Sequence, residues 1–149
     1  RLEVKASSER MRAHNFSLEQ CNPPNGTVGL LLSFFVESSG GGLSIQDLIE
    51  RIEHQLDGDA NLILRLQETV AATLGDTTLT ALAMRFDESL ARSSLQAYEL
   101  KRIPAIREGI PLEVTQVRFR SDISRITPAD LDALGEQNSR LRDLLPPKA

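Results

Sequence analysis

The sequence predicts a mainly helical domain, a compact bundle of about four to six helices, with an α+β fold as the alternative. Residues 43–103 carry apolar side chains at helical spacing, interrupted only by the short breaks Gly58-Asp59 and Gly75-Asp76. Aromatic residues make up 4% of the chain and Trp is absent, which favours helix packing over a β-sandwich. At 149 residues the chain suits one domain over residues 1–149. Because it begins with Arg1, we expect a fragment of a longer chain.

Two helices are predicted between residues 44 and 75. Ser44 suits an N-cap with Asp47 three residues on, and Gly58 suits the left-handed end of that helix. Asp59 can cap the next helix, which Gly75 closes. The apolar stripes of the two helices are Ile45, Leu48, Ile49, Ile52 and Leu56, and then Leu62, Ile63, Leu66, Val70 and Leu74.

A third helix is predicted from Asp76 or Thr77 onward. Its buried side would carry Leu79, Leu82, Phe86 and Leu90. Ser93 or Ser94 would interrupt it before Leu95, Tyr98 and Ile103, and Pro104 would end it.

The N-terminal region predicts a strand and then a helix. Leu2, Val4 and Ala6 alternate with polar residues, which indicates a strand over 2–6 with one buried face. Ser7 or Ser8 could cap a helix carrying Met11, Asn15 and Leu18. A firm turn follows at residues 21–26, where two prolines precede Asn25-Gly26.

The most apolar stretch, residues 27–36, suits either a doubly buried strand or a short buried helix. Periodicity does not decide between them, and we prefer the helix because a helical region follows. The glycine run Gly40–Gly42 has no Lys-Ser or Lys-Thr after it, so we interpret it as a flexible connector rather than a phosphate-binding loop.

Two elements are predicted near the C-terminus. Residues 112–120 indicate a minor strand with a bulge near Thr115-Gln116. Thr127, Pro128 and Asp130 then suit the N-cap and the first positions of a helix over 127–145.

One loop has the spacing of oxygen ligands for a cation. Counted from Asp57, the loop resembles an EF-hand at positions 1, 3, 5 and 12. Those positions are Asp57, Asp59, Asn61 and Glu68. Leu62 stands where the motif needs glycine, and Asp59 also suits a helix cap, so we prefer a capped helix–helix turn and predict no metal or other cofactor.

Residues that could carry catalysis are few and isolated. His54 lies on the polar side of a predicted helix, His14 stands alone, and Cys21 has no basic neighbour in sequence to lower its pKa. No nucleophile elbow is present. The prediction therefore leans against an enzyme and names no catalytic residue.

The predicted C-terminal helix could be an oligomerisation element. Its residues Leu131, Leu134, Asn138, Leu141 and Leu145 fall at heptad positions, with Asn138 at a register-fixing site. An ordinary helix packed on the domain is the preferred alternative, because only about two heptads are present. Together with Arg118 and Arg120 of the predicted strand, these residues make up the predicted interaction surface.

Charge and composition limit the partners. The net charge of −4 disfavours nucleic acid, and the cluster Arg118, Arg120 and Arg125 suits a solvated strand face better than a phosphate site. No apolar run is long enough to span a bilayer. One cysteine excludes an intramolecular disulfide, which is compatible with a reducing compartment, and the cytoplasm is favoured as the location.

These observations lead to one expected function and two alternatives. We expect a soluble, non-enzymatic protein–protein interaction module, an adaptor, chaperone-like factor or assembly component, whose partner is another protein or a second copy of the chain. The first alternative is a ligand- or metal-responsive regulatory domain that uses the loop Asp57–Glu68. The second is an enzyme whose site is assembled only in the fold.

Overall fold

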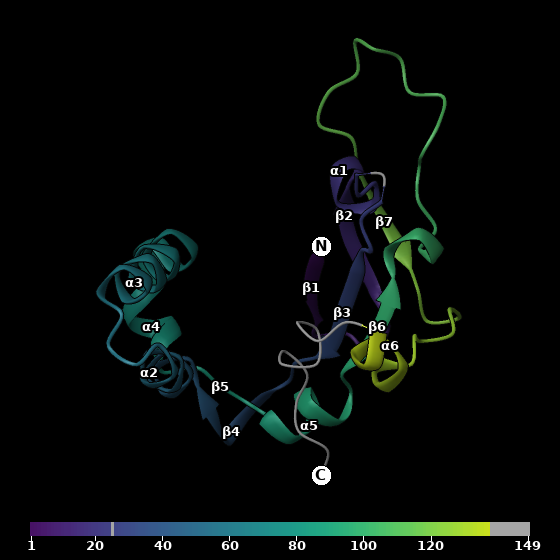
Figure 1. Ribbon diagram of the computed structural model, residues 1–149. Coiled ribbons are helices and arrows are strands. Elements are labelled where there is room, and N and C mark those ends of the chain that lie inside the picture. Colours follow the sequence, from purple (N-terminus) through teal and green to yellow (C-terminus); the bar gives the residue numbers. More distant parts are fainter. Residues whose placement is uncertain (25, 138–149) are drawn as a thin grey trace. The chain divides into compact units, whose positions relative to one another are not determined.

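The protein is an α+β structure, seen in a computed structural model that describes residues 1–24 and 26–137 (Figure 1). Its described residues form seven strands in three sheets, with helices between them. The prediction of a mainly helical bundle is therefore wrong. Stretches that looked helical from local spacing pair instead with strands far away in the sequence.

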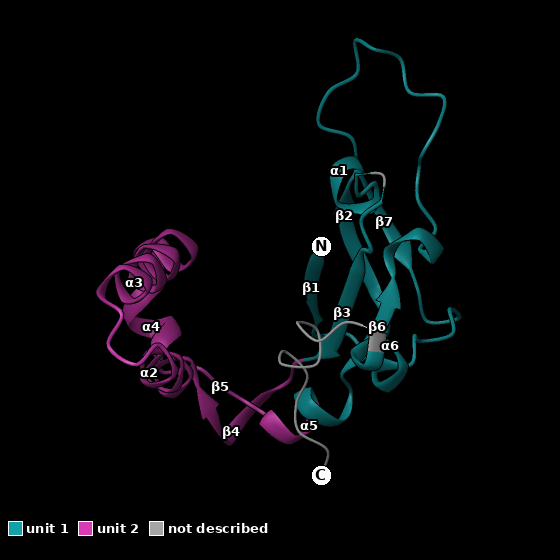
Figure 2. Ribbon diagram, viewed as in Figure 1, with its two compact units in different colours: residues 1–35, 91–149 teal, residues 36–90 magenta. Residues whose placement is uncertain are grey.

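The chain divides into two compact units (Figure 2). Unit 1 comprises residues 1–35 and 91–149, and unit 2 comprises residues 36–90 between them. Compactness does not decide whether the two units fold as one domain, so a single domain over 1–149 stays a prediction.

Unit 1 contains a three-stranded and a two-stranded sheet. In the first, the central strand β3 pairs in parallel with β1 and antiparallel with β6. In the second, β2 pairs antiparallel with β7. The strands of unit 1 are β1 (Leu2–Ser7), β2 (Ala13–Ser17), β3 (Leu30–Phe35), β6 (Gln96–Glu99) and β7 (Arg118–Asp122). Its helices are α1 (Leu18–Cys21), η2 (Leu100–Arg102) and α6 (Leu131–Gln137), and α5 (Glu88–Ser93) crosses the boundary between the units.

The core of unit 1 joins residues from both of its sheets. Apolar side chains from four separate stretches of the sequence meet in it, so burial drives the long-range pairing. Its members are Phe16, Cys21, Leu31, Tyr98, Leu100, Ile103 and Ile123.

Unit 2 holds the two helices that the sequence predicted best. Ser44 caps α2 in a capping box with Asp47, and Asp59 caps α3, which ends at Gly75. Gly58 takes up the expected left-handed conformation with a φ of 78°. The elements of unit 2 are β4 (Ser38–Ser44), α2 (Ile45–Gln55), α3 (Ala60–Leu74), η1 (Gly75–Thr77), α4 (Thr78–Leu82) and β5 (Arg85–Phe86).

Four predictions are wrong because strands form where helices or a free connector were expected. The helix preferred at 27–36 is strand β3, and the helix expected after Ser7 or Ser8 is strand β2. The third helix ends at Leu82, and β5, the short helix α5 and β6 follow along the rest of its predicted course. The glycine run is not a free connector but part of β4, which pairs with β5.

The C-terminal elements are shifted from their predicted places. Strand β7 begins at Arg118, and residues 112–117 are loop, with Leu112 98% exposed. Helix α6 begins at Leu131, and Asp130 rather than Thr127 accepts from the backbone N–H groups of Asp132 and Ala133. The remainder of the predicted helix 127–145 lies outside the described residues.

No helix in the described part of the chain is long and apolar enough to cross a membrane. This agrees with the prediction that the segment holds no membrane span.

Candidate active site

Strand β1 turns its charged side chains inward and its apolar side chains outward. Glu3 and Lys5 are half-buried, whereas Leu2 is 40% and Val4 54% exposed. The sequence pattern had suggested the reverse, with the apolar residues on the buried face. Covering charged groups costs free energy unless they are paired and hydrogen-bonded. This face of β1 is therefore a candidate site.

Glu3, Lys5 and Gln20 form a closed polar cluster on that face. The Lys5 Nζ lies 3.2 Å from the Glu3 Oε1, and the Gln20 Nε2 donates to the same oxygen at 2.7 Å. The Gln20 Oε1 accepts from the Lys5 Nζ at 3.4 Å. The side chains of Glu3 and Lys5 are 14% and 23% exposed, so solvent and ligands can reach the cluster.

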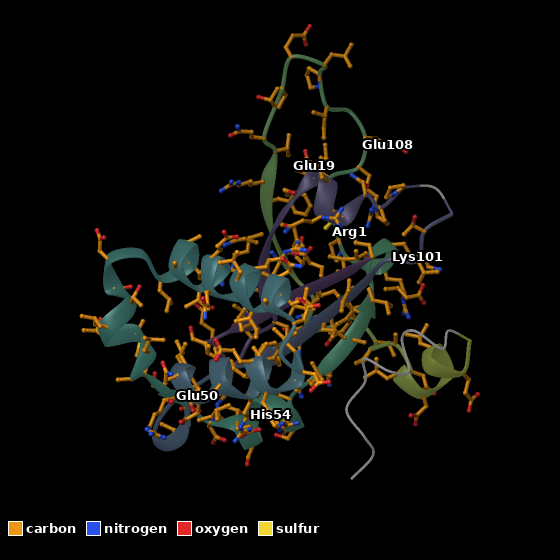
Figure 3. The ribbon with its side chains drawn as sticks, turned by 60° about the vertical axis from the view of Figure 1, so that its left-hand side comes forward. Arg1, Glu19, Glu50, His54, Lys101 and Glu108 are labelled. Atoms are coloured by element: carbon orange, nitrogen blue, oxygen red, sulfur yellow. The ribbon has the colours of Figure 1, made fainter. Side chains whose placement is uncertain are left out.

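Helix α1 holds Gln20 in place. Ser17 caps the helix, and the Gln20 Oε1 accepts from the Ser17 backbone N–H at 2.9 Å, which completes a capping box. Cys21 anchors the helix in the core with no exposed surface. Arg1 donates from Nη1 to the Glu19 carbonyl at 2.8 Å (Figure 3). Strand β1 and α1 are thus tied together at both ends of the cluster.

Three buried polar residues, Arg12, His14 and Ser33, form a hydrogen-bonded cluster next to strand β1. Ser33 of β3 is the register partner of Lys5, and its Oγ lies 2.8 Å from both the Arg12 Nη1 and the His14 Nε2. Burial, followed by the charges of Arg12, Lys5 and Arg120, lowers the pKa of His14 below its ordinary value. The imidazole is therefore held neutral among cations.

The loop with EF-hand-like spacing uses its acids for other purposes. The Asp59 carboxylate accepts from the backbone N–H groups of Asn61 and Leu62 at 3.0 and 3.1 Å, as a helix cap does. Glu68 lies on α3, and Asp57 is exposed. Within residues 1–24 and 26–137, no group of three His, Cys, Asp or Glu side chains could hold a metal.

The predicted interaction residues lie on two different elements. Arg118 and Arg120 lie on the exposed face of β7, and the Arg120 Nη2 pairs with the Glu9 Oε2 at 2.9 Å. Leu131 and Leu134 are half-buried on α6. The other three, Asn138, Leu141 and Leu145, lie outside the described residues. The interaction surface stays a prediction.

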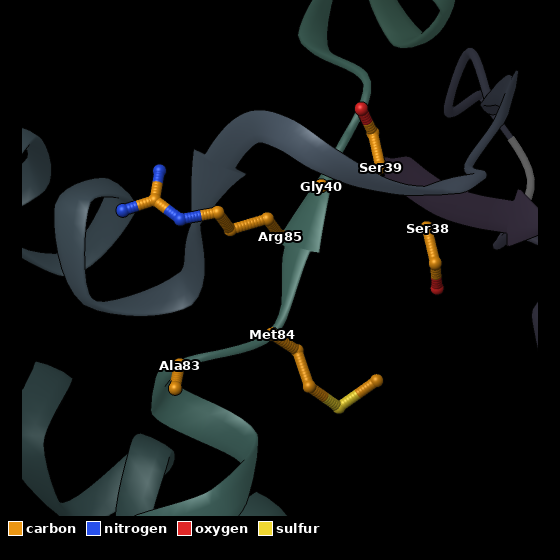
Figure 4. Close-up of a pocket in the computed structure, with 6 residues that line it drawn as sticks. All are labelled: Ser38, Ser39, Gly40, Ala83, Met84 and Arg85. Carbon is orange, nitrogen blue, oxygen red and sulfur yellow. The ribbon is translucent and has the colours of Figure 1, made fainter.

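Two further residues considered for catalysis, His54 and Cys21, lie in different units. His54 is exposed on α2, one turn after Glu50 (Figure 3). The Cys21 thiol is fully buried, and burial raises its pKa. A shallow depression in unit 2 has one charged side chain, Arg85, among its described lining residues (Figure 4). Its lining residues are Ser38, Ser39, Gly40, Ala83, Met84 and Arg85.

A protein-family model matches residues 1–124 and is described as "Putative PD-(D/E)XK family member, (DUF4420)". The chain belongs to this family. No curated protein and no solved structure matches the sequence. PD-(D/E)XK proteins are a nuclease-like enzyme superfamily, so the match contradicts the predicted non-enzymatic adaptor and the leaning against an enzyme.

The DUF4420 family description contains a sequence motif, which is Pro-Asp and later an Asp or Glu, any residue, and a Lys. The second part occurs twice here, as Glu3-Val4-Lys5 and as Glu99-Leu100-Lys101. Lys101 lies in the turn η2 with its side chain 77% exposed, and it pairs only with Glu99. Glu3 and Lys5 instead share the covered face of a strand. We therefore assign the motif to Glu3 and Lys5.

The residues of this DUF4420 chain do not by themselves complete a site for a divalent metal. Such ions take several oxygen ligands, and nucleases commonly use them. Glu3 offers one carboxylate, no Pro-Asp pair occurs in the sequence, and the described residues contain no cluster of three metal-binding side chains.

The sequence contained a signal for this site that alternation alone obscured. Leu2, Val4 and Ala6 indicated the strand correctly, but the candidate site residues are the polar ones between them. A Glu-X-Lys triplet inside a strand places both charges on one face, because side chains alternate. Gln20 carried no comparable signal, since its contact with Glu3 depends on the fold.

Proposed function

We propose that unit 1 belongs to a nuclease, an enzyme that cleaves phosphodiester bonds in nucleic acid, with Glu3, Lys5 and Gln20 in its active site. The observation that carries the proposal is the half-buried Glu3–Lys5 pair on β1, at the spacing that the family's motif prescribes.

Lys5 is suited to stabilise negative charge on a phosphate. An ammonium group has three N–H donors, and Glu3 and Gln20 accept two of them. The third donor is free of partners among the described residues and can reach a phosphate oxygen. Because the two acceptors fix the amine before substrate arrives, its charge is preorganised for the transition state.

Glu3 and Gln20 complete the polar site. Glu3 can accept a proton or a hydrogen bond from an attacking water. The Gln20 Nε2 donates to the Glu3 Oε1 at 2.7 Å and so holds the carboxylate in place. Loss of Gln20 would leave the Glu3 carboxylate free to rotate toward Lys5 alone.

The distribution of charge supports a nucleic-acid substrate. Unit 1 carries 14 Lys and Arg against 11 Asp and Glu, a net charge of +3. Unit 2 carries 3 against 10, a net charge of −7. The overall charge of −4, which had disfavoured nucleic acid, averages two units of opposite sign. Unit 1 by itself suits the phosphate backbone.

Arg118 and Arg120 are proposed contacts for that backbone. They alternate on the exposed face of β7, opposite Ser17 and Asn15 of β2. Two residues along a strand span about 6.8 Å, a distance comparable to the separation of nearby phosphates. The Arg118 side chain has no hydrogen bond or ion pair with another described residue.

The test compares the two Glu-X-Lys pairs in the full natural protein. Glu3→Gln and Lys5→Ala should each lower cleavage of labelled single-stranded and duplex DNA and RNA by about 100- to 1,000-fold, with Mg²⁺ or Mn²⁺ in the buffer. The matched controls, Glu99→Gln and Lys101→Ala, change the exposed pair and should leave cleavage unchanged. Absence of cleavage by the natural protein on all four substrates, or full activity of Glu3→Gln and Lys5→Ala, would contradict the proposal.

A further inference from the structure

Arg12 is a buried cation whose hydrogen bonds go only to neutral oxygens. The residue is 7% exposed. Its Nη1 donates to the Ser33 carbonyl at 2.7 Å and to the Ser33 Oγ at 2.8 Å, and its Nη2 donates to the Ser94 carbonyl. No carboxylate of the described residues pairs with it. Buried arginines without an acidic partner are costly, so this one calls for an explanation.

The packing around Arg12 compensates part of that cost. The guanidinium lies over the Phe35 ring, 4.5 Å from its centroid, which is a cation–π geometry. The Phe35 backbone N–H in turn donates to the Ser94 Oγ at 2.9 Å. Arg12, Phe35 and Ser94 therefore form one closed network at the places where residues 36–90 leave and rejoin unit 1.

The same network reaches the Lys5 side chain through Ser33, His14 and Phe16. Ser33 accepts two hydrogen bonds from Arg12. It is the register partner of Lys5 and contacts His14 through its Oγ. His14 meets the Phe16 ring edge-on at 6.4 Å, and the Lys5 Nζ lies 5.5 Å from the centroid of that ring. The Lys5 amine therefore rests on the Phe16 ring, which His14 meets edge-on.

The hydrogen-bond directions explain why an arginine is needed next to Ser33 and His14. Arg12 donates to the Ser33 Oγ, which leaves the serine hydroxyl free to donate to the His14 Nε2. That arrangement suits a neutral imidazole. A protonated His14 would place a further cation among Arg12, Lys5 of β1 and Arg120 of β7, the charged groups around it.

We propose that Arg12 is a positioning residue for the active-site Lys5, acting through Ser33 and His14. The inference rests on the proposed nuclease function. Arg12 touches no reacting atom; it fixes the hydroxyl of Ser33, which fixes His14, which supports the Lys5 amine in reach of Glu3 and Gln20.

The test separates the charge of Arg12 from its hydrogen bonds in the full natural protein. Arg12→Gln should lower the single-turnover cleavage rate by about 10- to 100-fold while the Kd for uncleaved nucleic acid changes little. In NMR titrations the His14 pKa should rise, because a neighbouring cation has gone. Arg12→Lys keeps the charge but not the planar fork, so His14 should stay neutral while the rate recovers only in part.

Two further variants keep the test decisive. Arg125→Gln removes an exposed arginine of the same unit and should leave rate and His14 titration unchanged. If Arg12→Gln fails to fold, Ser33→Ala removes the hydroxyl that Arg12 and His14 share, and it should slow cleavage in the same way. A folded Arg12→Gln or Ser33→Ala protein with the natural rate and pH profile would overturn the inference. Inactive natural protein would instead count against the nuclease proposal.

Discussion

Glu3 and Lys5 are separated by one residue, and on a strand this spacing directs both side chains to the same side. The same spacing at Glu99 and Lys101 has no such effect, because Lys101 lies in a 3₁₀ turn after the strand has ended. Whether a Glu-X-Lys triplet places both charges on one face therefore depends on the backbone that carries it. Half-burial of Glu3 and Lys5 also reduces solvent screening between them, which strengthens their interaction relative to an exposed pair.

His14 makes the stability of the protein depend on pH. Its pKa is lowered in the folded state, chiefly by burial, from the ordinary value of 6.5 that the unfolded chain retains. Between these two pKa values the unfolded state binds more protons. The free energy of unfolding should therefore hold its full value above pH 6.5 and decline as the pH falls from 6.5 toward the folded pKa.

Urea unfolding between about pH 7.5 and 5 measures this dependence. His14→Gln should flatten the curve over that window, whereas exposed His54→Gln should not change it. Asp47 and Asp122 also have lowered pKa values, through hydrogen bonds from Ser44 and Ser124, but their ordinary value is 3.8, so they act in more acidic solution. An equal slope in natural and His14→Gln protein would refute the assignment.

At the scale of elements, sequence reasoning succeeded where the determinants are local. Ser44, Asp47 and Asp59 cap helices within three residues of themselves, and they were predicted correctly. Strand β3 pairs with β1, 28 residues earlier, and with β6 beyond unit 2, and no window of sequence contains those partners. For the same reason Glu3 and Lys5 could be found from their triplet, whereas Gln20, Arg12 and His14 required the fold.

Strand β4 shows what the glycine run is for. A Cβ added to Gly42 would overlap the backbone carbonyl of Phe86 in β5, whereas Gly40 has nothing within 4 Å. Gly42→Ala should therefore destabilise unit 2 by about 1–3 kcal/mol, as backbone or strand must shift to admit the methyl group. Gly40→Ala, the matched control, should unfold at nearly the natural denaturant concentration. Equal stability of the two variants would show that the β4–β5 pairing adapts.

At the scale of the molecule, opposite net charges on the two units predict a local salt effect. Arg118→Gln and Arg120→Gln should each reduce the slope of log K against log salt concentration for nucleic-acid binding by about 1, because each phosphate contact releases counterions. The control is Arg65→Gln on α3 of the acidic unit 2, which should leave the slope unchanged. Fluorescence anisotropy with uncleaved DNA and RNA at several salt concentrations measures all three slopes.

The bond between the Phe35 backbone and the Ser94 side chain has a consequence for inheritance. This hydrogen bond holds the two ends of the 55-residue segment 36–90 at neighbouring points on unit 1. Segments whose two ends lie close together can be lost, lengthened or exchanged without reconnecting the strands on either side. Residues 36–90 can thus be replaced during evolution while Glu3, Lys5 and Gln20 stay unaltered. Another module can be grafted at the same junction by protein engineering.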